Sequence, residues 1–139
     1  MNKILTVCPY CGCGCGLYLH VENGKIVGVS PSRSHPVNNG SLCVKGWNAY
    51  EFVAHSDRLK YPMIRHNGEL KRSTWNEALT LVAARLDEIK RKHGPDSIGI
   101  LSSAKCTNEE NYLMMKFARA VLGTNNIDHC ARLCHSSTV

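Results

Sequence analysis

The chain has 139 residues, eight cysteines, an apolar content of 43% and a formal net charge of +6 at pH 7. This length and apolar content suffice for an ordinary domain core and exclude a disordered tail or a coiled coil, while the scattered basic residues argue against nucleic acid binding. The longest apolar run near the start, Ile4–Val7, is too short for a secretory leader or a membrane span, so we expect a cytoplasmic protein.

The first predicted element is a loop that carries Cys8, Cys11 and Cys15 in the spacing C-x2-C-x3-C. A fourth cysteine, Cys43, follows after 27 intervening residues. A cubane iron–sulfur cluster takes four thiolates, and a short loop supplies three of them when its backbone wraps one corner of the cube. Interspersed glycines let the backbone N–H groups approach the sulfurs. The spacing therefore favours a 4Fe-4S cluster bound by these four cysteines.

Other interpretations of these cysteines stay open. Disulfides are disfavoured because no segment is typical of secretion and cytosolic thiols stay reduced. A structural zinc site with four thiolates is the main competitor, although zinc modules usually contain two C-x2–4-C knuckles and Cys43 has no cysteine nearby. Cys13 lies inside the loop and could replace a neighbouring ligand, although the spacing needs only the other three.

Two hairpins are predicted, because in each an Asn-Gly pair separates two short strand-like segments. They occupy residues 17–29 and 63–70 and turn at Asn23-Gly24 and Asn67-Gly68. Between them, a polar loop over residues 31–40 delivers Cys43, and residues 47–55 are compatible with a short helix.

From Thr74 the apolar residues follow a helical period. Thr74 and Glu77 form a capping box, in which the hydroxyl and the carboxylate each satisfy a free N–H group, and Gly94-Pro95 ends the helix. A buried strand over residues 97–101 follows. A second capping box then begins a helix that runs from Thr107 to Gly123.

The predicted fold class is α/β (α+β), because strands and helices alternate in the second part of the chain. We expect a small, β-rich iron–sulfur subdomain over residues 1–60 and the beginning of an α/β domain over residues 61–139. The loop over residues 102–108 lies where open α/β sheets bind ligands and where a helix dipole attracts phosphate. It contains neither GxGxxG nor a Walker A lysine, so an ordinary capped turn and a phosphate site both stay open.

The last motif, residues 129–135, ends in the adjacent pair Cys134-His135. Neighbouring residues on an extended chain point apart, which disfavours a nucleophile pair. A thiolate is a soft metal ligand, so half of a metal site is one interpretation. A buried cysteine beside a surface histidine is the other.

Motifs along most of the chain combine into one pattern. They are Cys8-Pro-Tyr-Cys11, Gly14-Cys15-Gly16, Leu42-Cys43-Val-Lys45-Gly46, Ser102-Ser103, Asn108-Glu-Glu-Asn-Tyr112, Lys116-Phe-Ala-Arg119, Gly123-Thr-Asn-Asn126 and Cys130-Ala-Arg-Leu-Cys-His135. Together they resemble the start of the catalytic subunit of formate dehydrogenases of the molybdenum or tungsten bis(pyranopterin guanine dinucleotide) type. The resemblance runs from about Val7 to the last residue and is greatest to archaeal, deazaflavin-linked enzymes.

The resemblance implies roles for particular residues. Cys8, Cys11, Cys15 and Cys43 match the cysteines that bind a 4Fe-4S cluster. Lys45 matches the lysine between that cluster and the proximal pterin. Cys134 matches the position that ligates the molybdenum or tungsten, and His135 matches the histidine that handles the proton of formate. Ser102, Ser103 and Asn108 fall in a segment near the pterin dinucleotide.

The implied reaction is HCOO⁻ → CO₂ + H⁺ + 2e⁻, with the electrons leaving through the cluster. The implied partners are formate as substrate, the rest of the catalytic subunit and an electron-accepting iron–sulfur or flavin subunit. The chain ends at Val139, whereas the catalytic subunits it resembles are much longer, so we expect the isolated chain to lack formate oxidation.

Alternative functions are a sibling enzyme, such as formylmethanofuran dehydrogenase or a molybdenum nitrate reductase, and a stand-alone module. The Cys134-His135 pair favours formate chemistry over the siblings. The stand-alone module would be either an iron–sulfur electron carrier or a zinc-stabilised interaction domain.

Overall fold

The computed structural model describes residues 1–130, which divide into two compact units. Unit 1 contains residues 1–58, 101–115 and the chain from Asp128, and unit 2 contains residues 59–100 and 116–127. The predicted division into domains 1–60 and 61–139 stays a prediction.

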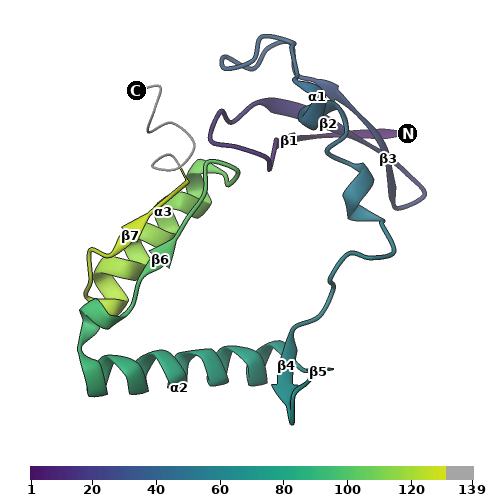
Figure 1. Ribbon diagram of the computed structural model, residues 1–139. Helices are drawn as coiled ribbons and strands as arrows, with labels where there is room; N and C mark the ends of the chain where they lie inside the picture. The colour runs from purple at the N-terminus through teal and green to yellow at the C-terminus, as the bar shows by residue number, and fades with distance from the viewer. Residues whose placement is uncertain (131–139) are drawn as a thin grey trace. The chain divides into compact units, whose positions relative to one another are not determined.

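Unit 1 begins with a three-stranded antiparallel sheet in the order β1-β2-β3 (Figure 1). The strands are β1 (Asn2–Val7), β2 (Gly16–Glu22) and β3 (Lys25–Pro31). The predicted hairpin is confirmed, and Asn23 and Gly24 take φ values of 49° and 75°, which suit a tight hairpin turn. Strand β1 was not predicted. It pairs along its whole length with β2, from Asn2 opposite Val21 to Val7 opposite Gly16.

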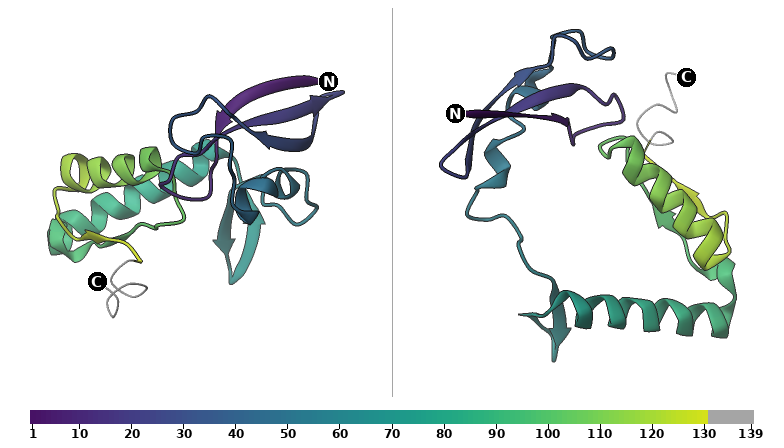
Figure 2. Two further views of the ribbon diagram at one scale, coloured as in Figure 1. Left: turned by 90° about the horizontal axis from the view of Figure 1, so that it is seen from above. Right: turned by 180° about the vertical axis from the view of Figure 1, so that it is seen from behind.

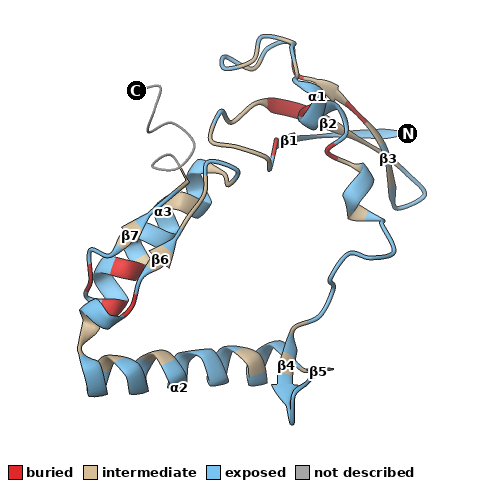
Figure 3. Cartoon of the chain, in the orientation of Figure 1, coloured by how far each residue is buried: buried red, intermediate tan, exposed pale blue. Residues whose placement is uncertain are grey.

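The core of unit 1 lies against the start of β2 (Figure 3). Leu17 is fully buried and packs in a cluster with Cys8, Val29 and Ala49. Leu19, two residues further along β2, packs against the same cluster, as the alternation of side chains in a strand requires. One of the predicted cluster ligands, Cys8, is thus part of the hydrophobic core.

The helix predicted over residues 47–55 is wrong in its bounds. The chain forms a short helix α1 (Val44–Trp47) and a separate 3₁₀ turn η1 (Glu51–Val53). Asn48 is the C-cap of α1: its backbone N–H and its side-chain Nδ2 both donate to the Val44 carbonyl, over 3.3 and 2.8 Å. Helix α1 starts at Val44, immediately after Cys43, and not at residue 47 as predicted.

Unit 2 contains the second hairpin and the long helix (Figure 2). The hairpin consists of β4 (Met63–His66) and β5 (Glu69–Arg72), and it leads into α2 (Trp75–His93). The hairpin and the Thr74 capping box are both confirmed: Glu77 N donates to Thr74 Oγ1 over 3.2 Å, and Thr74 N donates to Glu77 Oε2 over 3.0 Å. Within residues 1–130, no helix is long and apolar enough to span a membrane.

The strand predicted over residues 97–101 is mostly wrong. Pro95–Ser97 form a 3₁₀ turn, η2, and the strand β6 is limited to Ile100–Leu101. It pairs with β7 (Ile127–Asp128), and Leu101 is 90% exposed instead of buried. Within the described chain this sheet has two short strands, so nothing covers the Leu101 side chain.

The second capping box and its helix are confirmed. Thr107 N donates to Glu110 Oε2 over 2.7 Å, and Glu110 N donates to Thr107 Oγ1 over 3.2 Å. Helix α3 (Asn108–Lys116) continues as a π-helical segment, η3 (Phe117–Leu122). It ends at Gly123, whose φ of 82° lies in the left-handed region that glycine adopts readily.

Candidate metal centre

The cysteine loop of unit 1 is closed by its own backbone. Cys8 N donates to the Cys15 carbonyl over 2.8 Å, directly beyond the last β1–β2 pair. Residues 9–14 therefore form a short loop that projects from the end of two paired strands. Cys11 lies on this loop, and Cys8 and Cys15 flank it.

Asn38 holds the segment before Cys43 next to the end of the cysteine loop. Its Oδ1 accepts from Gly16 N over 2.8 Å, and its Nδ2 donates to the carbonyls of Gly16 at 3.1 Å and Ser41 at 2.8 Å. Gly16 directly follows Cys15, and Ser41 lies two residues before Cys43. One amide side chain thus ties the cysteine loop to the segment that carries the fourth cysteine. Asn38 is not among the residues predicted from the sequence.

Asn108, at the start of α3, contacts the cysteine loop from a distant part of the sequence. Its Nδ2 donates to the Gly12 carbonyl over 2.8 Å. A Cβ atom on Gly12 would lie 2.7 Å from Asn108 Oδ1, so a side chain at this position would displace the Asn108 amide. Asn108 was predicted to contact the pterin dinucleotide. That role stays a prediction, and the structure adds a contact with the loop of the cluster cysteines.

Burial and neighbouring sulfurs determine the electrostatics of the four thiols. Burial raises the pKa of Cys8, and the nearby Cys11 and Cys43 raise it further against the opposing effect of a backbone hydrogen bond from Tyr10. Burial, together with a hydrogen bond to Cys13, raises the pKa of Cys15 to about 11. The backbone N–H groups of Gly46 and Lys45 lower the pKa of Cys43.

Two properties of these thiols suit an iron–sulfur cluster: they are soft metal ligands, and neighbouring thiols raise the pKa of Cys8 and Cys15. Thiolates that crowd one another are costly in the absence of positive charge, and bound iron supplies that charge. In residues 1–130, no three cysteine, histidine or acidic side chains are arranged to hold a single metal ion. A cubane cluster does not require such convergence, because each of its four thiolates binds a different iron. The ligand assignment stays a prediction.

The segment over residues 102–107 is held together by Asn111, a residue whose role was not predicted from the sequence. Ser102 donates its hydroxyl hydrogen to Asn111 Oδ1, and Asn111 Nδ2 donates to the carbonyls of Ser103 and Thr107, each over 3.1 Å. The Ser103 hydroxyl accepts from Lys105 N over 3.0 Å. Both serine hydroxyls thus have hydrogen-bond partners within the chain, Asn111 on α3 for Ser102 and the Lys105 N–H for Ser103, and their predicted contact with the pterin stays a prediction.

The remaining predicted residues lie on α1 or beyond the described chain. Lys45 is exposed on α1, two residues after Cys43. Cys134 and His135 lie outside the described residues. Their predicted roles, and that of Lys45 between the cluster and the pterin, stay predictions.

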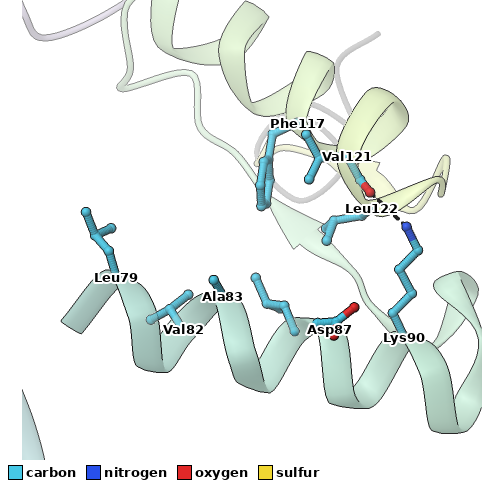
Figure 4. Close-up of a pocket in the computed structure, with 9 residues that line it drawn as sticks. Leu79, Val82, Ala83, Asp87, Lys90, Phe117, Val121 and Leu122 are labelled. Carbon is cyan, nitrogen blue, oxygen red and sulfur yellow. Dashed lines mark hydrogen bonds between the residues drawn. The ribbon is translucent and has the colours of Figure 1, made fainter. Parts of the chain in front are cut away.

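Unit 2 contains an apolar groove between α2 and η3 (Figure 4). It encloses about 360 Å³ and is lined mainly by apolar side chains, among them Leu79, Val82 and Phe117. Lys90 closes one end, where its Nζ donates to the Val121 carbonyl over 2.8 Å. The groove contains no cluster of polar groups typical of an active site.

Family comparisons divide the chain into two matched regions. Residues 1–55 match the Fe4S4 domain of molybdopterin oxidoreductases, and residues 58–139 match the molybdopterin oxidoreductase family itself. The chain belongs to the molybdopterin oxidoreductase family. The matches confirm the predicted cofactors at the level of a 4Fe-4S cluster and a molybdenum or tungsten pterin.

The chain is also similar to individual formate dehydrogenases. It is 54% identical over 139 residues to the F420-dependent formate dehydrogenase 1 subunit alpha of Methanococcus maripaludis, covering 100% of this chain and 20% of that protein. It is 49% identical over 146 aligned residues to formate dehydrogenase H of Escherichia coli, with the same two coverages. The chain therefore spans about a fifth of the length of these relatives.

A solved structure has the same fold over nearly the whole chain. Acetylene hydratase from Pelobacter acetylenicus superimposes with a TM-score of 0.77 at 28% identity, covering 99% of this chain and 20% of that protein. This likeness and the observed mixture of strands and helices confirm the predicted α/β (α+β) class.

Proposed function

We propose that this chain is the N-terminal part of a formate dehydrogenase catalytic subunit, which oxidises formate to CO₂, H⁺ and two electrons. The observation that carries the proposal is the 54% identity, over the whole chain, to the alpha subunit of an F420-dependent formate dehydrogenase. The names of two further archaeal relatives, each 52% identical over 134 residues, support F420 as the final electron acceptor.

The predicted metal ligands, His135 and Lys45 each have a task in this reaction. Cys8, Cys11, Cys15 and Cys43 would hold the 4Fe-4S cluster, and Cys134 would hold the pterin-bound metal. When bound, these groups supply the two-electron oxidation of formate and the one-electron steps that follow. The soft thiolate of Cys134 suits a metal that changes its oxidation state.

His135 would take up the proton that formate releases. An imidazole suits this task because its ordinary pKa lies near working pH. Lys45 would place a positive charge beside the path of the electrons. Asn38 and Asn108 bind no substrate in this proposal, and they position the backbone that carries the cysteines.

The test uses the native protein that contains this chain, purified without oxygen. We expect formate to reduce F420 or a viologen dye, with release of one CO₂ per two electrons. A Cys134→Ser variant should lose at least about 90% of this activity and keep its cluster iron, whereas the control Cys106→Ser, outside the predicted ligand set, should keep both. Failure of formate to reduce any acceptor, together with turnover of nitrate or formylmethanofuran, would contradict the proposal.

A further inference from the structure

Cys13 lies inside the cysteine loop but is not one of the four predicted cluster ligands. It is the exposed cysteine of the loop, and its Sγ lies 3.6 Å from Cys15 Sγ, from which it accepts a hydrogen bond. A disulfide bond requires about 2.05 Å between the two sulfurs. The two sulfurs would therefore have to approach each other by roughly 1.5 Å to form the bond.

The backbone between the two cysteines explains this proximity. Alternate residues of an extended chain share a face but are about 6.6 Å apart along it. Gly14 has a φ of 72°, a left-handed conformation that turns the chain and shortens this separation. A Cβ atom on Gly14 would meet nothing within 4 Å, so glycine is required here for its conformation rather than for space.

We propose that Cys13 and Cys15 form a reversible disulfide in the cluster-free chain by exchange with a small-molecule disulfide. One protein thiolate attacks the small disulfide, forms a mixed disulfide and releases one small thiol. The second protein thiolate attacks the mixed disulfide and releases the other small thiol. The protein loses two S–H bonds and gains one S–S bond, and the small disulfide accepts two electrons and two protons.

This disulfide would control cluster insertion, and this consequence rests on the proposed cluster site. Cys15 is one of the four predicted ligands, so its oxidation leaves three thiols for a cluster that takes four. Reduction releases Cys15 again, and a bound cluster would protect it from exchange. Cys13 thereby makes the loop sensitive to the thiol–disulfide balance of its surroundings.

The experiment begins with the full, cluster-free chain in reduced form, without oxygen. Wild type and a Cys13→Ser variant, which keeps all four predicted ligands, are treated with oxidised glutathione, alkylated, digested and analysed by mass spectrometry. We expect the Cys13–Cys15 disulfide as the main product in wild type. A Gly14→Ala variant should form at least about threefold less of it, because alanine disfavours a positive φ.

A second step measures cluster insertion with iron and sulfide, with no thiol reductant added. Oxidised wild type should bind at least about tenfold less iron than the reduced protein and recover when dithiothreitol is added. The Cys13→Ser variant, oxidised in the same way, should lose much less of its iron binding.

Two results would overturn the inference. One is free Cys13 in oxidised wild type, with the disulfide between Cys8 and Cys11. The other is equal loss of iron binding in wild type and Cys13→Ser. If the disulfide forms but reduced wild type binds no iron–sulfur cluster, the proposed cluster site fails and the cysteine pair is supported.

Discussion

Single amide side chains hold the cysteine segments of unit 1 in place. Asn38 makes three hydrogen bonds, to Gly16 on one side and Ser41 on the other, and Asn108 makes one to Gly12. Both amides bind main-chain groups, so they fix the backbone on which the thiols are mounted. They leave the thiols themselves free for metal.

Asn38→Ala tests this positioning role. The substitution removes three hydrogen bonds, each worth about 0.5–1.5 kcal/mol, and it should lower the free energy of unfolding by about 2 kcal/mol. It should also release cluster iron to a chelator several-fold faster, because the Cys43 segment is no longer tied to Gly16. Denaturant titration and the rate of iron release measure the two effects.

Asn126→Ala is the matched control. Asn126 belongs to unit 2 and donates one side-chain hydrogen bond, to the Asp96 carbonyl over 2.8 Å. It should lower stability by about 1 kcal/mol and leave iron release unchanged. Equal iron release from wild type and Asn38→Ala would contradict the positioning role of Asn38.

The candidate cysteines could be predicted from the sequence, whereas Asn38 was not predicted and Asn108 was predicted only for the pterin. The spacing of Cys8, Cys11 and Cys15 is a local pattern with a known chemical use, so it could be recognised without a structure. The Asn38–Gly16 contact joins residues 22 positions apart, and the Asn108–Gly12 contact joins residues 96 positions apart. Asparagine is common in loops for many reasons, and no local pattern specifies such a distant partner.

The first turn of α2 contains a charged side chain, Glu77, that stabilises the helix. The Ser73 hydroxyl and the Thr74 N–H donate to Glu77 Oε2 over 2.7 and 3.0 Å and hold the pKa of Glu77 below its usual value. Because these bonds favour the charged form, Glu77 stabilises the folded state fully above its unfolded pKa of about 4.3. This contribution is lost as the pH falls through the lower pKa of the folded state.

Glu77→Gln should therefore remove one source of acid sensitivity. Glutamine still accepts hydrogen bonds in a capping box but does not titrate. We expect wild type to be more stable than Glu77→Gln at pH 6 and this advantage to disappear on acidification toward pH 3. Thermal unfolding followed by circular dichroism at several pH values measures the difference.

Glu22→Gln, an exposed substitution at the end of β2, is the control and should not reproduce this pH-dependent difference. An advantage of wild type over Glu77→Gln that stayed constant from pH 6 to pH 3 would exclude the proposed role of the Glu77 charge.

Local signals explain which elements could be predicted. The Asn-Gly turns and the two capping boxes are properties of a few adjacent residues, and all four are present in the structure. Strand β1 was missed because its pairing with β2 is a contact across the cysteine loop. The strand at residues 97–101 was predicted to be too long, because an apolar run does not reveal how many neighbouring strands are present to pair with it and cover it.

At the scale of the whole molecule, much apolar surface is exposed in both units. On α2, Leu79 is 61% and Val82 is 55% exposed, and both line the groove with Phe117. Large contiguous apolar patches are uncommon on monomeric soluble proteins. The chain spans about a fifth of the length of its relatives.

The isolated chain should bind a hydrophobic dye through this groove. A Leu79→Gln/Val82→Gln double variant should lower dye fluorescence at least about twofold and keep its helix content, because both side chains are exposed and glutamine favours helices. Ala84→Gln, also exposed on α2, is the control and should change neither. Unchanged fluorescence in the double variant would show that the dye binds elsewhere.

A count of iron and sulfide per chain decides whether unit 1 binds a 4Fe-4S cluster. The wild-type chain, assembled without oxygen, should bind about four iron and four sulfide ions, whereas Cys43→Ser should bind fewer and lose them faster to a chelator. A colourless protein with one zinc ion, or a Cys43→Ser variant that keeps a full and equally stable cluster, would contradict the assignment.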